Sequence, residues 1–121
     1  MISMPFEVIS SSGNLISIRI TGELKKAESD RMQTVAAEVI KREGKIKILV
    51  FLQNFLGWEK GADWEDTSFQ VKHDSDIEKI AIVGDEKWRN LVLAFTGKPF
   101  RSVETEYFTP SQLEQARAWI A

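Results

Sequence analysis

The sequence offers few of the side chains that usually carry out catalysis. Its 121 residues include one histidine, His73, and no cysteine, which excludes disulfides, thiolate metal sites and cysteine nucleophiles. A Ser-His-Asp group could be assembled from Ser68 or Ser75 with His73 and Asp74. Neighbours on a helix point in different directions, however, and no oxyanion-hole motif accompanies them. We expect His73 to be a structural hydrogen-bonding residue near a helix end, with a polar group lining a pocket as the alternative.

Other chemical motifs are missing as well. The glycines Gly57 and Gly61 are flanked by Trp, Glu and Lys, which is not a phosphate-binding sequence, and no nucleophile elbow occurs. Glu104 and Glu106 lie two apart on an expected strand, where we interpret them as the solvated face of an edge strand and not as an acid/base pair. A metal site with one histidine would need carboxylates for every other ligand. The sequence therefore predicts no enzyme, no metal and no cofactor.

Charge and hydropathy exclude two further classes of protein. The net charge is −2, from 16 basic and 18 acidic residues that are interleaved along the chain. A nucleic-acid-binding protein usually has a basic excess on one face, so we expect no nucleic-acid partner. No apolar run approaches the roughly 20 residues that span a bilayer, and residues 1–8 lack the basic and apolar regions of a signal peptide. The expected location is the cytoplasm.

Alternating strands and helices predict one α/β domain over residues 1–121. We expect strands at 6–10, 15–21, 46–52, 77–83 and 103–108, and helices at about 27–42, at about 60–73, after Asp85 and after Thr109. Ser11 to Asn14 predict a hairpin between the first two strands, and the helical crossovers predict mainly parallel pairing elsewhere. In the helix after Asp85, one face should carry Trp88, Leu91, Val92 and Phe95.

The segment 54–76 is the unusual part of the chain. It contains Phe55, Trp58, Trp64 and Phe69, all outside any predicted strand, together with His73. A helix over 60–73 would carry large apolar groups on two sides, so it is either sandwiched or presents some of them to a ligand, a partner or a membrane. One interpretation is that Trp58, Trp64 and Phe69 pack the helix onto the sheet, and the other is that the helix covers an apolar pocket beside the sheet. Its acidic residues are expected in the loop and first turn, where they favour the helix dipole: Glu59, Asp63, Glu65 and Asp66.

Several short motifs together resemble the bacterial SpoIIAA-like proteins of the STAS superfamily (sulphate transporter and anti-sigma-factor antagonist). They are Phe55-Leu56-Gly57-Trp58, Trp64-Glu65-Asp66, Lys72-His73, Ile80-Ala81-Ile82-Val83-Gly84-Asp85 with Trp88, and Tyr107-Phe108. The resemblance covers nearly the whole chain. It implies a STAS-like mixed sheet of four or five strands with an N-terminal hairpin and about four helices, mainly on one side of the sheet. It also implies a ligand- or protein-binding module without catalytic activity, in which a mobile amphipathic helix is connected with apolar ligands and membranes.

One departure from that family concerns its phosphorylation switch. Anti-anti-sigma factors carry an Asp-Ser pair just after the strand that matches 46–52, whereas this chain has Gln53-Asn54-Phe55-Leu56-Gly57, without a hydroxyl. The sequence therefore excludes serine phosphorylation at that position. Thr67 and Ser68 come too late in the chain to replace it.

Two hypotheses follow for the function. The first is a non-catalytic module for a small apolar or lipid-like ligand, with peripheral contact to a membrane. Its ligand-binding residues would be Phe55, Trp58, Trp64, Phe69, His73 and Trp88. The alternative is a regulatory protein-interaction module, in which the same aromatic residues dock a partner or a second copy to form a homodimer.

Overall fold

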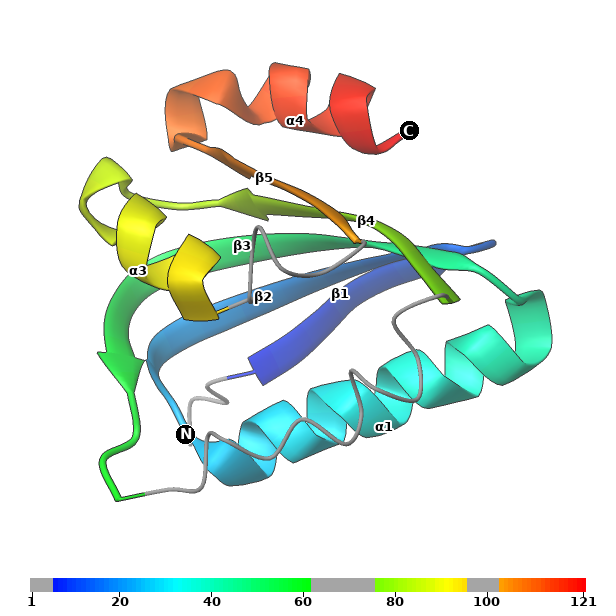
Figure 1. Cartoon of the computed structure of the whole chain (residues 1–121), viewed down its shortest axis with the longest axis horizontal. Coiled ribbons are helices and arrows are strands. Elements are labelled where there is room, and N and C mark those ends of the chain that lie inside the picture. The colour runs from blue at the N-terminus through cyan, green and yellow to red at the C-terminus, as the bar shows by residue number, and fades with distance from the viewer. Residues whose placement is uncertain (1–5, 62–75, 96–102) are drawn as a thin grey trace.

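Five strands form one mixed sheet in the order β1-β2-β3-β4-β5 (Figure 1). The computed structural model describes residues 6–61, 76–95 and 103–121, without the side chains of Phe6 and Phe95. The strands are β1 (Phe6–Ser12), β2 (Leu15–Leu24), β3 (Ile46–Trp58), β4 (Ile77–Val83) and β5 (Glu104–Phe108). β1 and β2 pair antiparallel, and every later neighbour pairs parallel. The predicted fold class is confirmed.

The predicted hairpin joins β1 and β2, but its turn is confined to Gly13 and Asn14, because β1 continues to Ser12. Gly13 has a φ of +58°, a conformation that glycine adopts without steric cost. The carbonyl of Asn14 accepts a hydrogen bond from the backbone N–H of Lys47 at 2.8 Å, and its side chain donates to the carbonyl of Lys45 at 3.2 Å. The turn therefore also fixes the point at which β3 joins the sheet.

Helix α1 (Lys26–Glu43) packs on one face of the sheet, below it in Figure 1. Ala36 and Val39 are buried, and the rest of the predicted apolar stripe packs against the same core: Met32, Val35 and Ile40. Gly44 ends the helix with a φ of +84° and donates its N–H to the Ile40 carbonyl at 2.8 Å. The amphipathic stripe and the stop signal are thus confirmed.

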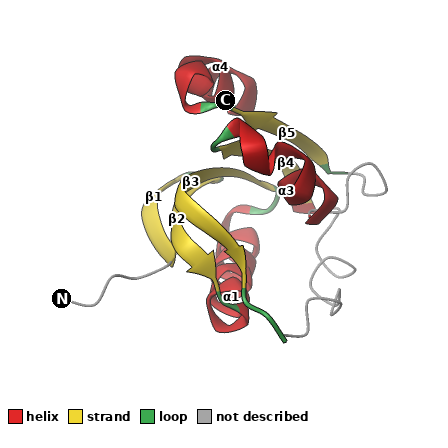
Figure 2. Ribbon diagram, turned by 90° about the vertical axis from the view of Figure 1, so that its left-hand side faces the viewer, coloured by secondary structure: helices red, strands yellow, loops and turns green. Residues whose placement is uncertain are grey.

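The other described helices lie on opposite faces of the sheet. The short 3-10 helix η2 (Glu86–Trp88) and α3 (Arg89–Phe95) share the core that α1 covers, through Trp88 and Val92. Helix α4 (Leu113–Ile120) covers the other face, where Ala116 and Ile120 pack against Ala81 and its neighbours (Figures 1 and 2). The fourth predicted helix, at 60–73, lies outside the described residues except for a turn at Lys60 and Gly61.

The caps of these helices agree with the sequence pattern, but the predicted face of the helix after Asp85 is wrong at one position. The Asp85 side chain accepts a hydrogen bond from the N–H of Lys87 at 2.9 Å. The backbone N–H of Thr109 donates to the Gln112 side chain at 3.0 Å, which forms a capping box before η3 (Pro110–Gln112). Leu91 was expected to share the buried face, yet its side chain is 56% exposed. The 3-10 turn through Trp88 shifts the helical phase, so Val92 packs inward without Leu91.

Strand β3 is longer than predicted, and this corrects the placement of two aromatic residues. It runs to Trp58 instead of stopping at Leu52, so Phe55 and Trp58 belong to a strand. Its register with β2 jumps from the pair Thr21–Gln53 to the pair Glu23–Gly57, which is a bulge on the β3 side. Asn54 has a φ of +51° and Gly57 a φ of +105°, and both residue types tolerate this conformation. The bulge interrupts the apolar run of β3, so the hydropathy pattern of the sequence predicted that the strand ends at Leu52.

Candidate functional site

Three of the six predicted site residues meet where β3 ends. Phe55, Trp58 and Trp88 form an aromatic cluster with edge-to-face contacts, at ring-centroid distances of 5.2 Å for Phe55–Trp58, 4.9 Å for Phe55–Trp88 and 6.0 Å for Trp58–Trp88. Phe55 is buried, and the two tryptophans are half-buried against the core that α1 covers. A Cβ at Gly57 would make only an ordinary contact with Cη2 of Trp88, at 3.5 Å, so glycine is favoured there by its φ of +105° and not by lack of space. The cluster joins β3 to η2, which directly precedes α3.

Neighbouring side chains near the end of β3 point to opposite faces, as they do in any strand. Phe55 is 6% exposed, whereas Leu56 is 74% exposed, the largest exposure among the large apolar side chains of the described residues. Positive φ values at Asn54 and Gly57 hold the backbone on both sides of this pair. An apolar side chain is therefore presented to solvent by a strand and not by a loose loop.

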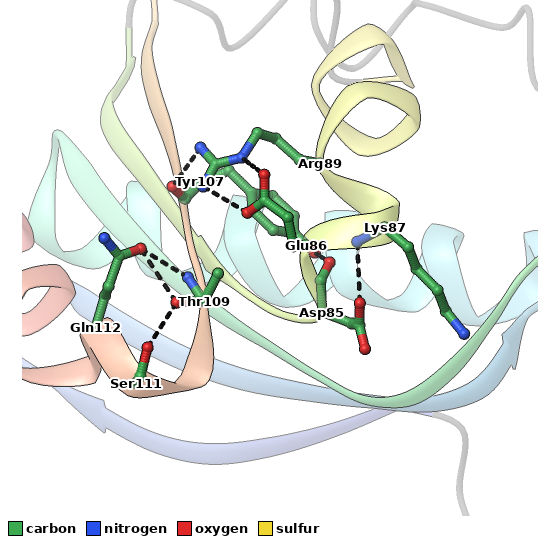
Figure 3. A network of polar contacts seen from close by, with 8 residues as sticks. All are labelled: Asp85, Glu86, Lys87, Arg89, Tyr107, Thr109, Ser111 and Gln112. Atoms are coloured by element: carbon green, nitrogen blue, oxygen red, sulfur yellow. Dashed lines mark hydrogen bonds and ion pairs between the residues drawn. The ribbon is translucent and has the colours of Figure 1, made fainter.

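A polar network lies where β4 and β5 end (Figure 3), and it includes Glu86 of η2, the short helix that also carries Trp88. The hydroxyl of Tyr107 donates to the backbone carbonyl of Asp85 at 2.7 Å, and the N–H of Gly84 donates to the carbonyl of Phe108 at 2.9 Å. Gly84 leaves the room for this contact, because a Cβ there would come 2.5 Å from the Tyr107 hydroxyl and 3.0 Å from Leu52. Burial raises the pKa of Tyr107 to about 12. The hydroxyl is therefore a hydrogen-bond donor at neutral pH and cannot act there as a base.

Arg89 is the second centre of this network. Its guanidinium donates two hydrogen bonds of 2.8 Å to the carboxylate of Glu86 and one of 3.2 Å to the carbonyl of Tyr107, and it lies 5.4 Å from the centre of the Tyr107 ring (Figure 3). The hydrogen bond from Arg89 lowers the pKa of Glu86, and the same bond raises the pKa of Arg89. Both groups stay charged and neutralise each other. This arrangement positions α3 against β5 and supplies neither a nucleophile nor a proton acceptor near neutral pH.

Glu59 makes a contact that the sequence did not predict: its Oε1 accepts the backbone N–H of Lys26 at 3.1 Å. Its expected effect on the dipole of a helix at 60–73 concerns a segment that lies almost wholly outside the described residues. Its own N–H donates to the carbonyl of Leu24 at 2.9 Å. Glu59 thus serves the first turn of α1, where an anion is favoured and where Lys25 at the cap position makes no side-chain hydrogen bond. The sequence pattern could not predict this contact, because 33 positions separate the two residues.

The other predicted site residues, Trp64, Phe69 and His73, lie outside the described residues, so their part in a site remains a prediction. The sequence analysis missed Leu56 as an exposed group and Tyr107 with Arg89 as a structural pair. A signal for Leu56 was present, because Asn54 and Gly57 are two residues that tolerate positive φ on either side of it. Across residues 6–61, 76–95 and 103–121, no group of three or more His, Asp or Glu side chains is placed to hold a metal ion.

Comparisons with known proteins agree with this architecture. A SpoIIAA-like family model matches residues 15–121. An uncharacterised protein of Shewanella loihica PV-4 with a SpoIIAA-like fold superposes with a TM-score of 0.73 at 18% identity, over 100% of this chain and 99% of that one. The Bacillus cell fate determinant SpoIIAA, in its phosphorylated form, gives a TM-score of 0.50 at 12% identity, over 91% of this chain and 96% of that one. These two similarities concern the fold.

A search among curated proteins gives no match. None of the helices described here is long and apolar enough to cross a membrane. The SpoIIAA-like fold is that of a regulatory or binding module, and the match over residues 15–121 extends from β2 to the end of α4. The chain belongs to the SpoIIAA-like family.

Proposed function

We propose that this protein is a non-catalytic regulatory module of the cytoplasm that docks a partner protein through the bulge of β3. The observation that supports this proposal best is Leu56, whose side chain is 74% exposed although its neighbour Phe55 is buried. A single apolar side chain that projects from a rigid backbone suits insertion into a pocket of a partner, because binding energy concentrates in a few such contacts.

The surroundings of Leu56 favour docking by a preformed surface. The aromatic cluster packs against the buried face of β3. The hydrogen bond between Glu59 and Lys26 holds the end of this strand against the start of α1. Little conformational entropy would then be lost when a partner covers the bulge. The segment Gln53–Gly57 has no hydroxyl side chain, so phosphorylation there does not control the proposed contact.

The test is a comparison of captured proteins between matched variants. Wild-type protein, Leu56→Lys and Ile9→Lys would be used to capture partners from an extract of the source cells. Ile9 is the control because it is also exposed, at 46%, but lies on β1. We expect one protein to be kept by the wild type and Ile9→Lys and lost by Leu56→Lys, with affinity reduced by about tenfold or more when measured with the purified partner. Equal capture by all three would refute the proposal.

A second candidate is a small apolar or lipid-like ligand, with peripheral contact to a membrane. The half-buried state of Trp58 and Trp88 favours it, since amphipathic rings of this kind often line apolar sites. The three rings of the aromatic cluster contact one another, however, so a ligand would have to lie over the cluster and not between its members. Because the rings leave no space between them for a ligand, we rank ligand binding behind protein docking.

Tryptophan emission distinguishes the second candidate from the first. The protein would be titrated with a long-chain fatty acid and with neutral and anionic liposomes. A blue shift that disappears in Trp58→Phe would support the ligand, because Trp58 would then be the residue that leaves water. Unchanged emission with all three additives would exclude an apolar ligand at the aromatic cluster and leave protein docking as the function of this surface.

A further inference from the structure

Strand β1 forms an edge of the sheet, and among the described strands it pairs only with β2 (Figure 2). One side of its backbone therefore makes no ladder with a described strand, over the seven residues Phe6–Ser12. Val8 is 37% exposed and Ile9 is 46% exposed, two of the four large apolar side chains that are exposed in the described part of the chain. An edge that combines unused backbone groups with apolar side chains is a template for another strand.

The opposite edge of the sheet is built differently. β5 has five residues, and two of them are the exposed glutamates Glu104 and Glu106. A short edge with repeated like charges resists pairing with another copy of itself. β1 carries one charged residue, Glu7, and its carboxylate forms an ion pair with Arg19 on β2. Charge therefore protects the β5 edge and leaves the β1 edge open to association.

We propose that β1 pairs antiparallel with β1 of a second copy of this chain, around a twofold axis at Ile9. In this register Ile9 faces Ile9 of the second copy, Val8 faces Ser10, and Glu7 faces Ser11, whose hydroxyl can donate to a carboxylate. A parallel arrangement would place the two Glu7 side chains next to each other, and like charges opposite each other oppose pairing. The antiparallel strand is thus complementary to itself, which is the requirement for a symmetric dimer.

The bulge in β1 lies at the centre of this arrangement. The register of β1 with β2 shifts between Val8 and Ser10, so Ile9 has no partner residue in that ladder. Its side chain is left exposed at the centre of the proposed contact. One pair of strands buries less surface than a permanent interface does, so the dimer should be weak and dependent on concentration. This proposal is independent of docking at Leu56, which lies on β3.

Sedimentation equilibrium of the full chain tests the proposal, over concentrations from about 1 µM to about 1 mM. We expect a monomer–dimer equilibrium in which Ile9→Lys weakens association by about tenfold or more, because two buried ammonium groups would face each other. Leu56→Lys is the matched control and should associate like the wild type. A monomer at every concentration would refute the proposal, and so would an unchanged dimer in Ile9→Lys. Association lost only in Leu56→Lys would assign the contact to the β3 bulge instead.

Disulfide trapping gives a second readout that does not depend on how Ile9→Lys folds. The chain has no cysteine, so Ile9→Cys would introduce a single thiol. Facing residues of paired strands bring their Cβ atoms to about 4.5–5.5 Å, close to the distance that a disulfide needs. We expect Ile9→Cys to form a covalent dimer at least about tenfold faster than Leu56→Cys under mild oxidation. Equal rates for the two variants would overturn the proposed register.

Discussion

Replacement of Gly84 by alanine tests how tightly the ends of β4 and β5 are packed. A methyl group at this position would lie 2.5 Å from the Tyr107 hydroxyl and 3.0 Å from both Cβ and Cδ1 of Leu52. The first distance is shorter than any real contact of this kind, so the tyrosine must move. Gly84 does not have a positive φ, so the expected cost comes from steric overlap and not from the backbone conformation.

The cost can be worked out from the contacts that are lost. Overpacking of a well-filled site costs about 1–3 kcal/mol. Displacement of the Tyr107 ring also breaks its 2.7 Å hydrogen bond to the carbonyl of Asp85, which contributes about 1 kcal/mol. The sum predicts a loss of roughly 2–4 kcal/mol in the free energy of unfolding, or roughly 8–16 °C in Tm for a domain of this size. Urea unfolding followed by tryptophan emission would measure it.

A double variant separates steric overlap from other effects. Tyr107→Phe removes the hydroxyl oxygen that the new methyl group would meet, at a cost of about 1 kcal/mol for the lost hydrogen bond. In the Tyr107→Phe background, Gly84→Ala should therefore cost at least about 1 kcal/mol less than in the wild type, since the shortest contact, with the Tyr107 hydroxyl, is gone and the contacts with Leu52 at 3.0 Å remain. The reasoning would be refuted if Gly84→Ala cost less than about 0.5 kcal/mol, or if the two changes were additive.

Three further predictions concern contacts elsewhere in the structure. Tyr107 is the only tyrosine, so phenolate absorbance should show its titration near the raised pKa of about 12. The stability that this tyrosine contributes should be complete below pH 10 and be lost as the pH rises to about 12. A titration midpoint near pH 10 would contradict the burial of the hydroxyl. Glu59→Ala should lower the free energy of unfolding by about 0.5–2 kcal/mol, because the hydrogen bond from the N–H of Lys26 to the Glu59 carboxylate is lost. Glu59→Gln should keep part of the stabilisation, and urea titration of both variants would measure the difference. Equal stabilities of the two variants would count against a capping role of Glu59. Lys79→Met should destabilise the protein by about 1 kcal/mol and speed amide hydrogen exchange in α4. The reason is that the Lys79 ammonium donates to the Trp119 carbonyl at 2.9 Å and lies 5.0 Å from the centre of the Trp119 ring. Unchanged exchange would show that α4 is held by apolar packing alone.

The elements that the sequence predicted well are those determined by neighbouring residues. The alternation of Ile16, Ile18 and Ile20 with polar residues marked β2, and all three isoleucines are buried. The apolar stripe of α1 and the capping box from Thr109 to Gln112 were equally local signals. In each case the information lies within a few positions of the chain, and the rest of the fold does not oppose it.

The features that escaped prediction depend on contacts between distant segments. β3 continues beyond Leu52 because β2 offers a partner as far as Leu24, and the sequence of β3 alone cannot reveal that. The carboxylate of Glu59 lies at α1 because the end of β3 pairs beside the start of that helix. The exposure of Leu91 follows from a 3-10 turn that precedes α3. Phe55, Trp58 and Trp88 were predicted as ligand-binding residues, and the sequence did not reveal that their rings contact one another edge to face.

The chemistry of the β3 bulge has a consequence for how the proposed docking would be controlled. A phosphorylated hydroxyl adds charge, so a contact that it governs depends on ionic strength and on a kinase. In this chain the corresponding segment presents Leu56 and has no hydroxyl. Burial of a leucine is driven by removal of apolar surface from water, which salt screening does not weaken. Any control of the proposed docking by phosphorylation would therefore have to act outside Gln53–Gly57, because this segment has no hydroxyl to modify.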